Sequence, residues 1–540
     1  MTRMRGAELL VQTLAAAGVT RIFALSGNQI MSIFDACLDT GIEIVHTRHE
    51  AACVFMADAW AQLTGQVGIC LVTAAPGAAN ALGPLYTARQ SESPIVLLTG
   101  DSPLVLDGRG AFQELDQVPM TAPLTKLSFR AISSGALGRD MARAISAALS
   151  GRPGPVHVAL PADVIEGDAT GAQVPAAMAF SPQVRRLKPD DAAFLTRALA
   201  AARTPLVLCG PAMNETRCGE RLLALANAVD APVVAMESPR GLNDPSLGNI
   251  SQSVAKSDLI VSLGKPVNFA LGFGSTDVFV PACEWIVIDA EAEERTRAKL
   301  NLAERLIRAV DADPQAAAEV LIGRRCGNKG RDSWRAEVAR CIAARNYTTA
   351  DMPSGNRITS AMLCTAVQRQ VEAAAESVVI SDGGEFGQWS QAITHPTHRI
   401  INGPAGAIGG ALCYAVAAKL AKPDAAVFAL MGDGTVGFHL AEFETAVREN
   451  TPFVVVIGND GRWNAEHLIQ IRKYGPGRMI GCELSDARYE EAVRGLGGHG
   501  EYVTDPADLD DALKRAANSG KVACVNVIIE SAPAPVGSTH

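Results

Sequence analysis

The chain has 540 residues, of which 48% are hydrophobic and 19% charged, so it is long enough for several domains with sizeable cores. The formal net charge of −9 argues against a nucleic acid or an anionic membrane surface as a partner. No apolar run reaches the length that a membrane span needs, and the 12 cysteines are scattered without metal-binding spacing. We therefore expect a cytoplasmic protein whose partner is neither a nucleic acid nor a membrane.

The first part of the chain alternates helix-like and strand-like segments. Residues 5–19 place apolar side chains at helical spacing. Short apolar runs typical of buried strands follow, separated by helix candidates, at 20–25, 42–47, 67–74 and 93–100. This alternation predicts a parallel, doubly wound sheet.

The same alternation occurs twice more along the chain. The central runs are 204–210, 231–236, 257–264 and 284–289. The last runs are 377–382, 398–402, 425–433, 451–460 and 523–530. Polar stretches at 181–191 and 323–333 have the composition of linkers. We predict an α/β protein with three doubly wound parallel-sheet domains, at 1–180, 190–325 and 350–540.

Two neighbouring strands of the last predicted domain end in small, oxygen-rich clusters. Gly432, Asp433 and Gly434 follow the first strand, and Asn459 and Asp460 follow the second. Because ligands bind at the carboxyl ends of parallel strands, the clusters should face one site. Glycines admit a phosphate close to the backbone, and carboxylate and amide oxygens suit Mg²⁺. The sequence therefore predicts a metal-bridged diphosphate.

This stretch resembles the motif of thiamin-diphosphate-dependent enzymes, which runs from Gly-Asp-Gly to a downstream Asn-Asn pair. The resemblance implies that Asp433, Asp460 and the backbone carbonyl of Arg462 bind Mg²⁺. It also implies that Gly432 and Gly434 belong to the coenzyme site. The chain departs from the motif because Asp460 replaces the second Asn, so Asn459 stays open as an alternative ligand.

Segments of the N-terminal region resemble the same family. Residues 45–65 resemble the segment that carries the glutamate activating the coenzyme, which gives that role to Glu50. Residues 75–80 resemble a loop near the aminopyrimidine ring, and residues 111–117 a loop whose glutamine, here Gln113, faces the reaction centre. By residue type alone, Glu50 is also an acid of the kind that helix starts favour.

Residues 403–411 resemble the turn that bends the coenzyme into a V. The resemblance places Ile408 beneath the thiazolium ring and lets the Gly406 carbonyl accept from the 4′-amine, although Ile408 also fits an ordinary core position. The resemblance covers nearly the whole chain and is closest to acetolactate synthases, benzaldehyde lyase and 2-hydroxyacyl-CoA lyases. It implies a carboligase or lyase that needs thiamin diphosphate and Mg²⁺ and acts through a C2 ylide on a 2-oxo acid or 2-hydroxy carbonyl donor.

Four further residues bear on the substrate. Gln29 stands where benzaldehyde lyase has a histidine, and Trp463 matches a tryptophan of that enzyme that walls the acceptor side. Glu466 lies where some 2-oxo acid decarboxylases hold an acid, and His467 could relay a proton. Exposed helix polarity explains Glu466 and His467 about as well.

Other functions stay open at this point. They are a 2-hydroxyacyl-CoA lyase, a 2-oxo acid decarboxylase and a catalytically silent, coenzyme-binding regulatory subunit, although an inactive relative has no need for Glu50. The central region has glycines after strands but no dinucleotide fingerprint, so FAD, ADP or no nucleotide remain open there. The resemblance implies a homodimer or homotetramer, because the family builds each site from two subunits.

Overall fold

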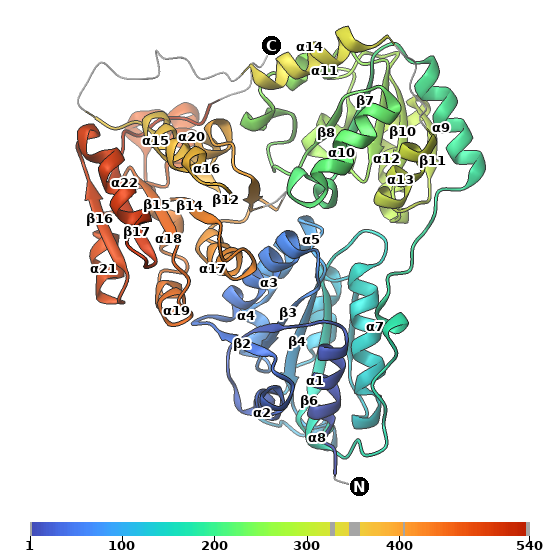
Figure 1. The fold of residues 1–540 in the computed structure, drawn as a ribbon, viewed down its shortest axis with the longest axis vertical. Helices are drawn as coiled ribbons and strands as arrows, with labels where there is room; N and C mark the ends of the chain where they lie inside the picture. Colours follow the sequence, from blue (N-terminus) through green and yellow to red (C-terminus); the bar gives the residue numbers. More distant parts are fainter. Residues whose placement is uncertain (1–2, 325–329, 345–356, 403–404, 536–540) are drawn as a thin grey trace. The chain divides into compact units, whose positions relative to one another are not determined.

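The computed structural model describes residues 3–324, 330–344, 357–402 and 405–535. The chain divides into two compact units, each built from parallel sheets with helices on their faces (Figure 1). The first unit contains Met1–Gln183, Leu412–Pro423 and His439–Thr451, and the second contains Val184–Ala411, Asp424–Phe438 and Pro452–His540. The three parallel sheets predicted from the sequence are confirmed, and the exact domain limits stay predictions.

The sheet of the first unit has the strand order β2-β1-β3-β4-β6-β5, and all its pairs are parallel. The strands are β1 (Arg21–Ala24), β2 (Glu43–His46), β3 (Gly68–Val72), β4 (Ile95–Asp101), β5 (Leu127–Arg130) and β6 (Val156–Pro161). Because β2 and β3 lie on opposite sides of β1, the strand order reverses between β1 and β3. Open α/β sheets bind ligands at such a reversal, outside the carboxyl ends of the strands.

Helices cover both faces of this sheet. They are α1 (Gly6–Ala16), α2 (Met31–Thr40), α3 (Glu50–Thr64), α4 (Pro76–Asn80), α5 (Leu82–Gln90), α6 (Gln117–Thr121), α7 (Leu137–Leu149) and α8 (Ala162–Glu166). Leu137, Met141 and Ile145 recur at helical spacing along α7 and pack into one core with apolar side chains of α1, α2 and the strands. The predicted first helix is thereby confirmed as part of this core.

Helix α3 is buried on nearly every side, because each residue of Ala51–Gln62 is buried. The ring of Tyr414 on α17 (Ala411–Ala421) packs edge-on against Phe55 at 5.5 Å, and its hydroxyl donates to Asp58 at 2.8 Å. Phe55 also contacts the ring of His439, which precedes α19 (Glu442–Arg448). A helix that is apolar all round needs partners on both faces. Segments from late in the sequence supply the second face.

The second unit contains two parallel sheets. The central sheet, ordered β11-β10-β9-β7-β8, consists of β7 (Pro205–Cys209), β8 (Val233–Ala235), β9 (Leu259–Leu263), β10 (Glu284–Ile288) and β11 (Leu306–Val310). The C-terminal sheet is ordered β13-β12-β14-β15-β17-β16. Its strands are β12 (Ser377–Ser381), β13 (His398–Ile401), β14 (Ala426–Gly432), β15 (Val454–Asn459), β16 (His499–Val503) and β17 (Ala523–Ile528). Its strand order reverses between β12 and β14.

The helices of the second unit flank these sheets (Figure 1). They are α9 (Pro189–Ala201), α10 (Glu215–Val229), α11 (Ile250–Val254), α12 (Ala292–Leu302), α13 (Pro314–Arg324), α14 (Asp332–Ala343), α15 (Ser360–Ala373), α16 (Gly384–Ile393), α18 (Asp433–Val436), α20 (Asn464–Tyr474), α21 (Tyr489–Gly495) and α22 (Leu509–Ala517). Among the described residues, no helix is long and apolar enough to cross a membrane. The cysteines of the described ranges are all free thiols.

Four strands are absent from the predicted apolar runs. Strands β5, β11 and β16 form sheet edges and are only partly buried, and they carry charged residues such as Arg130, Arg308 and Glu501. Strand β6 is fully buried but contains His157, whose ring bonds Thr99 and Thr121, each at 2.9 Å. Charged edges and a satisfied core histidine both break the apolar run that identifies a strand.

Candidate functional site

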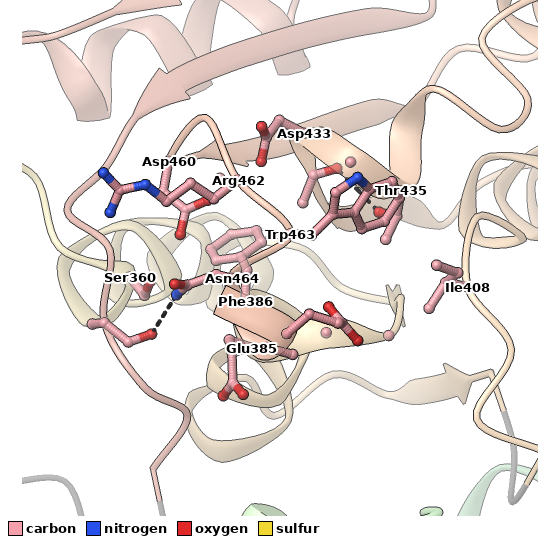
Figure 2. A pocket seen from close by; sticks show the side chains of 18 of the residues that line it. Ser360, Glu385, Phe386, Ile408, Asp433, Thr435, Asp460, Arg462, Trp463 and Asn464 are labelled. Atoms are coloured by element: carbon pink, nitrogen blue, oxygen red, sulfur yellow. Dashed lines mark hydrogen bonds between the residues drawn. The ribbon is translucent and has the colours of Figure 1, made fainter. Parts of the chain in front are cut away.

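The predicted diphosphate residues line one cavity of about 220 Å³ at the carboxyl edge of the C-terminal sheet. Strands β14 and β15 pair with Gly432 beside Gly458, so Asp433 and Asp460 follow adjacent strand ends (Figure 2). Nine of the residues considered for this region line the cavity, namely Gly406, Ile408, Gly432, Asp433, Gly434, Asp460, Arg462, Trp463 and Glu466, whereas Asn459 and His467 do not belong to its lining. The strand-order reversal lies at this edge, where such sheets bind ligands.

The two aspartates leave an unmet need for positive charge. Asp433 is 1% exposed, and its Oδ2 has no hydrogen-bond partner among the described residues. Burial raises the pKa of Asp433 to about 6. Burial, together with the charge of Asp433, raises the pKa of Asp460 to about 7. Buried carboxylates need a partner, and this oxygen pair suits a divalent cation such as Mg²⁺.

The side chain of Asn459 is used inside the fold. Its Nδ2 donates to Oδ1 of Asn526 at 3.1 Å, and its Oδ1 accepts from the Gly461 N–H at 3.1 Å. Asn459 is 1% exposed, whereas Asp460 lines the cavity. Both polar ends of the Asn459 amide are therefore engaged within the protein.

The two glycines of the first cluster have different reasons to be glycine. A Cβ at Gly434 would lie 2.8 Å from the indole of Trp463, which also packs edge-on against Phe438 at 6.2 Å. A Cβ at Gly432 would meet nothing within 4 Å. Trp463 therefore requires Gly434, and only Gly432 has open space in front of its backbone.

The turn that carries Ile408 is anchored by Asp382, which directly follows β12. Residues 403 and 404 of the predicted segment lie outside the described residues. Oδ1 of Asp382 accepts from the N–H groups of Gly383 and Gly409 at 2.6 and 2.9 Å, and Oδ2 accepts from Ala411 at 3.1 Å. A Cβ at Gly383 would lie 2.5 Å from Cγ2 of Ile408. Burial raises the pKa of Asp382 to about 6.

Glu466 and His467 occupy different environments on α20. Glu466 lies in the first turn, is exposed and lines the cavity. His467 is 3% exposed, and its Nδ1 has no hydrogen-bond partner among the described residues. Both interpretations of Glu466 therefore stay open, and exposed helix polarity is wrong for His467.

In the first unit, Glu50 is the first residue of α3 and contacts the short helix α4. Nδ2 of Asn80 donates to Oε2 of Glu50 at 2.9 Å. A Cβ at Gly77 would lie 3.6 Å from Oε1 of Glu50. Ala75, just before α4, has φ 46° and ψ −90°, a strained conformation of the kind that gathers at functional sites. The segments 45–65 and 75–80 thus meet at the Glu50 carboxylate.

The start of α3 is held by Glu442, the first residue of α19. Oε1 of Glu442 accepts from the Arg48 N–H at 3.0 Å, and the His49 N–H also stabilises the carboxylate. Oε2 accepts from the hydroxyl of Thr445 at 2.7 Å. Burial raises the pKa of Glu442, which is 1% exposed. A carboxylate from late in the sequence thus fixes the loop that leads into Glu50.

Gln29 and Gln113 also meet within the first unit. Nε2 of Gln29 donates to Oε1 of Gln113 at 2.6 Å, and the Thr73 hydroxyl donates to Oε1 of Gln29 at 2.6 Å. The predicted residues thus form two groups, one in each unit. Glu50, Gln29 and Gln113 belong to the first unit, and all the others belong to the second.

Comparison with known proteins identifies the family. The model of the thiamine pyrophosphate enzyme N-terminal TPP binding domain matches residues 4–120, and that of the C-terminal TPP binding domain matches residues 382–527. A probable acetolactate synthase of Mycobacterium bovis is 32% identical over 537 residues, which cover 98% of this chain and 96% of the relative. The chain belongs to the thiamin-diphosphate-dependent enzymes.

Relatives of this thiamin-diphosphate-dependent enzyme carry more than one activity in their names. Human 2-hydroxyacyl-CoA lyase 2 is 28% identical over 575 residues, covering 97% of this chain and 90% of the relative. A catabolic acetolactate synthase of Raoultella terrigena is 28% identical over 566 residues, covering 99% and 97%. The predicted family and enzyme class are therefore confirmed, and the choice of substrate stays open.

Several residues that contact or adjoin the predicted site residues of this thiamin-diphosphate-dependent enzyme were not predicted from its sequence. Asp382 and Thr73 each directly follow a buried strand, so the strand-end rule that found Asp433 also applies to them. Asn80 lies in the predicted segment 75–80 but was not singled out, and its contact with Glu50 depends on the fold. Glu442 reaches the helix start of Glu50 only through the fold, and no local pattern marks it.

Proposed function

We propose that this protein uses thiamin diphosphate and Mg²⁺ to form or cleave a carbon–carbon bond, as an acetolactate-synthase-like carboligase or lyase acting on a 2-oxo acid or a 2-hydroxy carbonyl donor. The observation that carries the proposal is the buried Asp433, with an oxygen unpartnered among the described residues, beside the half-buried Asp460, in a chain that contains both TPP binding domains. The Glu50 carboxylate, held by Asn80, argues against a catalytically silent regulatory subunit.

We assign the metal to Asp433, Asp460 and the backbone carbonyl of Arg462. The engaged amide of Asn459 supports Asp460 as the second side-chain ligand. The open space in front of Gly432 supports an approach of the diphosphate to the backbone there. With Mg²⁺ held there, these carboxylates would anchor the diphosphate and would take no part in the bond-making step.

When bound, thiamin diphosphate supplies a nucleophilic carbon and an electron sink for carbanion chemistry. The protein holds it in shape and moves protons. Ile408 and Gly406 would support the bent coenzyme, on a turn that Asp382 fixes through Gly409 and Ala411. Glu50 would exchange a proton with the pyrimidine N1′, and Trp463, Glu466, Gln29 and Gln113 would border the substrate.

We propose a homodimer or homotetramer in which Glu50 and the Asp433 site come from different subunits. Mixing inactive Glu50→Ala protein with inactive Asp433→Ala protein should restore part of the activity, because hybrid dimers contain one intact site. Each variant alone is the matched control. A fully active monomer in sedimentation experiments would contradict this arrangement.

The central part of the second unit contains a larger cavity of about 690 Å³, whose lining includes Arg240, Lys256 and Phe269. Arg240 and an exposed ring suit a phosphate-bearing nucleotide, and Lys256, which is paired with Glu337 at 2.6 Å, adds a second cationic side chain. We propose this cavity as the binding site for FAD or ADP. An absorbance scan for flavin and mass spectrometry of released nucleotides decide this.

The main test is to identify what the protein binds and turns over. Mass spectrometry of ligands released from the denatured protein should detect thiamin diphosphate, and metal analysis should detect Mg²⁺. The purified enzyme is then given pyruvate or a 2-hydroxyacyl-CoA, and products of ligation, decarboxylation and cleavage are separated. A protein that binds no thiamin diphosphate in the presence of Mg²⁺ would overturn the proposal.

A further inference from the structure

Three loops at the carboxyl edge of the first sheet are joined by a directed chain of hydrogen bonds. The Thr73 hydroxyl donates to Oε1 of Gln29, and Nε2 of Gln29 donates to Oε1 of Gln113, each at 2.6 Å. Gln29 follows β1, Thr73 follows β3, and Gln113 lies in the loop after β4. The strand order reverses between β1 and β3, and ligands of such sheets bind at the reversal. The series of hydrogen bonds therefore crosses the expected ligand-binding place.

Thr73 packs closely against the backbone of two glycines, Gly27 and Gly77. A Cβ at Gly27 would lie 2.4 Å from both Cβ and Oγ1 of Thr73, and a Cβ at Gly77 would lie 2.9 Å from its Cγ2. A side chain at either glycine would displace Thr73. The same Cβ at Gly77 would lie 3.6 Å from Oε1 of Glu50. The hydrogen-bond chain therefore runs beside the Glu50 carboxylate.

The loop that carries Gln113 is also fixed. Gln113 has φ +58°, a backbone region that non-glycine residues rarely adopt. The neighbouring Glu114 carboxylate accepts from the backbone N–H groups of Gly108, Gly110 and Ala111, and these bonds lower the pKa of Glu114. Strained residues of this kind gather at functional sites. The loop fixes the backbone of Gln113, and Gln29 fixes its side-chain oxygen.

The direction of the bonds sets the polarity that the chain presents. A side-chain amide has one oxygen acceptor and one NH₂ donor group. Thr73 occupies the oxygen of Gln29, so Gln29 turns its NH₂ group to the oxygen of Gln113. With its Oε1 engaged by Gln29, Gln113 has the N–H donors of its free Nε2 to offer a ligand. Such a group binds a carbonyl or carboxylate oxygen and cannot take a proton from a substrate hydroxyl.

We propose that Thr73 is a positioning residue, and that the Thr73–Gln29–Gln113 chain presents Nε2 of Gln113 to an oxygen of a 2-oxo acid substrate. The reaction itself rests on the function proposed above, whereas the hydrogen-bond chain does not. Without the Thr73 hydroxyl, both orientations of the Gln29 amide become available. Gln113 then loses its directed donor.

A first test needs neither coenzyme nor substrate. Thermal midpoints are measured for Thr73→Val, Gln29→Met and the double variant, with Thr73→Ser as the control that keeps the hydroxyl. Because the two side chains share a bond, the double variant should shift the midpoint by less than the sum of the single shifts. If the thermal shifts of the two single variants simply add up in the double variant, Thr73 and Gln29 do not share the proposed hydrogen bond.

A second test measures turnover of glyoxylate, pyruvate and 2-oxobutyrate with thiamin diphosphate and Mg²⁺ present. Thr73→Val should lower kcat/KM by about three- to tenfold, the effect of one neutral hydrogen bond. Thr73→Ser should match the wild type. The H/D exchange at coenzyme C2 should stay unchanged in both, because Glu50 is intact. An unaffected Thr73→Val, or a Thr73→Ser that falls as far, would overturn the role of the hydroxyl.

A third test uses Gln29→Glu, which keeps the shape but adds a titrating group. The protonated carboxyl can donate to Oε1 of Gln113 and the ionised one cannot, so kcat/KM of this variant should fall as pH rises through the pKa of the new carboxyl. The wild type contains the same neighbouring titratable and charged groups as the variant. Its kcat/KM should therefore not show the fall that the new carboxyl causes. These groups are Glu50 beyond Gly77, His46 bonded to Ser26, and Asp101 paired with Arg130. A flat profile in the variant would contradict the proposal.

The outcomes separate this proposal from the one it rests on. If the wild type shows no C2 exchange, the proposed function fails. The thermal midpoints of the single and double variants still decide whether the Thr73–Gln29–Gln113 hydrogen bonds exist. If the wild type exchanges C2–H but uses none of the three 2-oxo acids, Gln113 does not serve a 2-oxo acid and the proposed substrate class is wrong.

Discussion

The first and the C-terminal sheets have the same pattern of strand order and differ in the chemistry at the reversal of that order. The orders are β2-β1-β3-β4-β6-β5 and β13-β12-β14-β15-β17-β16. The reversal of the first sheet is bordered by the uncharged Gln29 and Thr73, and that of the C-terminal sheet by the buried Asp382 and Asp433. Topology fixes where ligand-facing residues stand, and residue type decides what they bind.

The two edges also differ in whether their polar groups are satisfied. Thr73, Gln29 and Gln113 are joined by hydrogen bonds, and Nε2 of Gln113 is the group proposed above to face a substrate. Asp433 keeps an oxygen without a partner among the described residues, and its charge raises the pKa of Asp460. Buried polar groups are normally paired. The carboxylates of the C-terminal edge therefore fit the cation proposed above, whereas the first edge has uncharged groups.

The largest effect on coenzyme binding should come from removing the Asp433 carboxylate. Asp433→Ala should weaken Mg²⁺-dependent binding of thiamin diphosphate by more than about a hundredfold, because even outer-sphere changes at metal sites cost up to that factor. Isothermal titration calorimetry with and without Mg²⁺ measures it. Asp424→Ala, an exposed carboxylate just before β14, is the control. Unchanged affinity in Asp433→Ala would rule out the metal assignment.

The difference in charge should appear as a pH dependence of the metal-free protein. The folded-state pKa values of Asp433 and Asp460, about 6 and about 7, lie above the ordinary value of 3.8. A carboxyl group whose pKa is raised by folding stabilises the folded state in its protonated form. This contribution is complete below the pKa of the unfolded state and is lost as the pH rises through the pKa of the folded state.

The free energy of unfolding should therefore fall between about pH 4 and about pH 7, by about 3 kcal/mol from Asp433 alone. Denaturant unfolding across this range measures the fall, and Mg²⁺ with thiamin diphosphate should suppress it. Asp460→Asn should flatten the profile, because it removes one of the two repelling carboxylates. An identical slope in Asp460→Asn would argue against the coupling.

A smaller effect is expected at the helix start of the first unit. Glu442→Gln keeps an acceptor but loses the charge that holds the Arg48 and His49 N–H groups. Unfolding should become easier by about 1–2 kcal/mol, and C2 exchange should slow a few-fold because Glu50 is less well fixed. Glu449→Gln, directly after the same helix, is the matched control. Equal behaviour of the two variants would remove Glu442 from this role.

The smallest expected effect separates the two glycines of the C-terminal edge. Gly434→Ala should destabilise the fold by about 1 kcal/mol, because its methyl group would press on the Trp463 indole. Gly432→Ala meets open space, so its thermal midpoint should stay at the wild-type value while coenzyme affinity falls. Equal thermal shifts would show that the contact with Trp463 is not what selects glycine at position 434.

The sequence could predict features that depend on local pattern. Apolar runs located the three sheets, and the clusters around Asp433 and Asp460 located the cavity because strand ends of a parallel sheet meet at one edge. Edge strands such as β16 escaped because solvent exposure removes the apolar run. Glu442 escaped because its partner loop is brought to it only by the packing of α19 and α3.

The central claim is that Glu50 activates thiamin diphosphate held by the Asp433 site, and H/D exchange at C2 tests it without any substrate. At saturating coenzyme and Mg²⁺, Glu50→Gln should bind the coenzyme but exchange C2–H at least about a hundredfold more slowly than the wild type, the lower end for loss of general acid–base assistance. Exchange at the wild-type rate in Glu50→Gln would contradict the claim and leave Glu50 as an acid at a helix start.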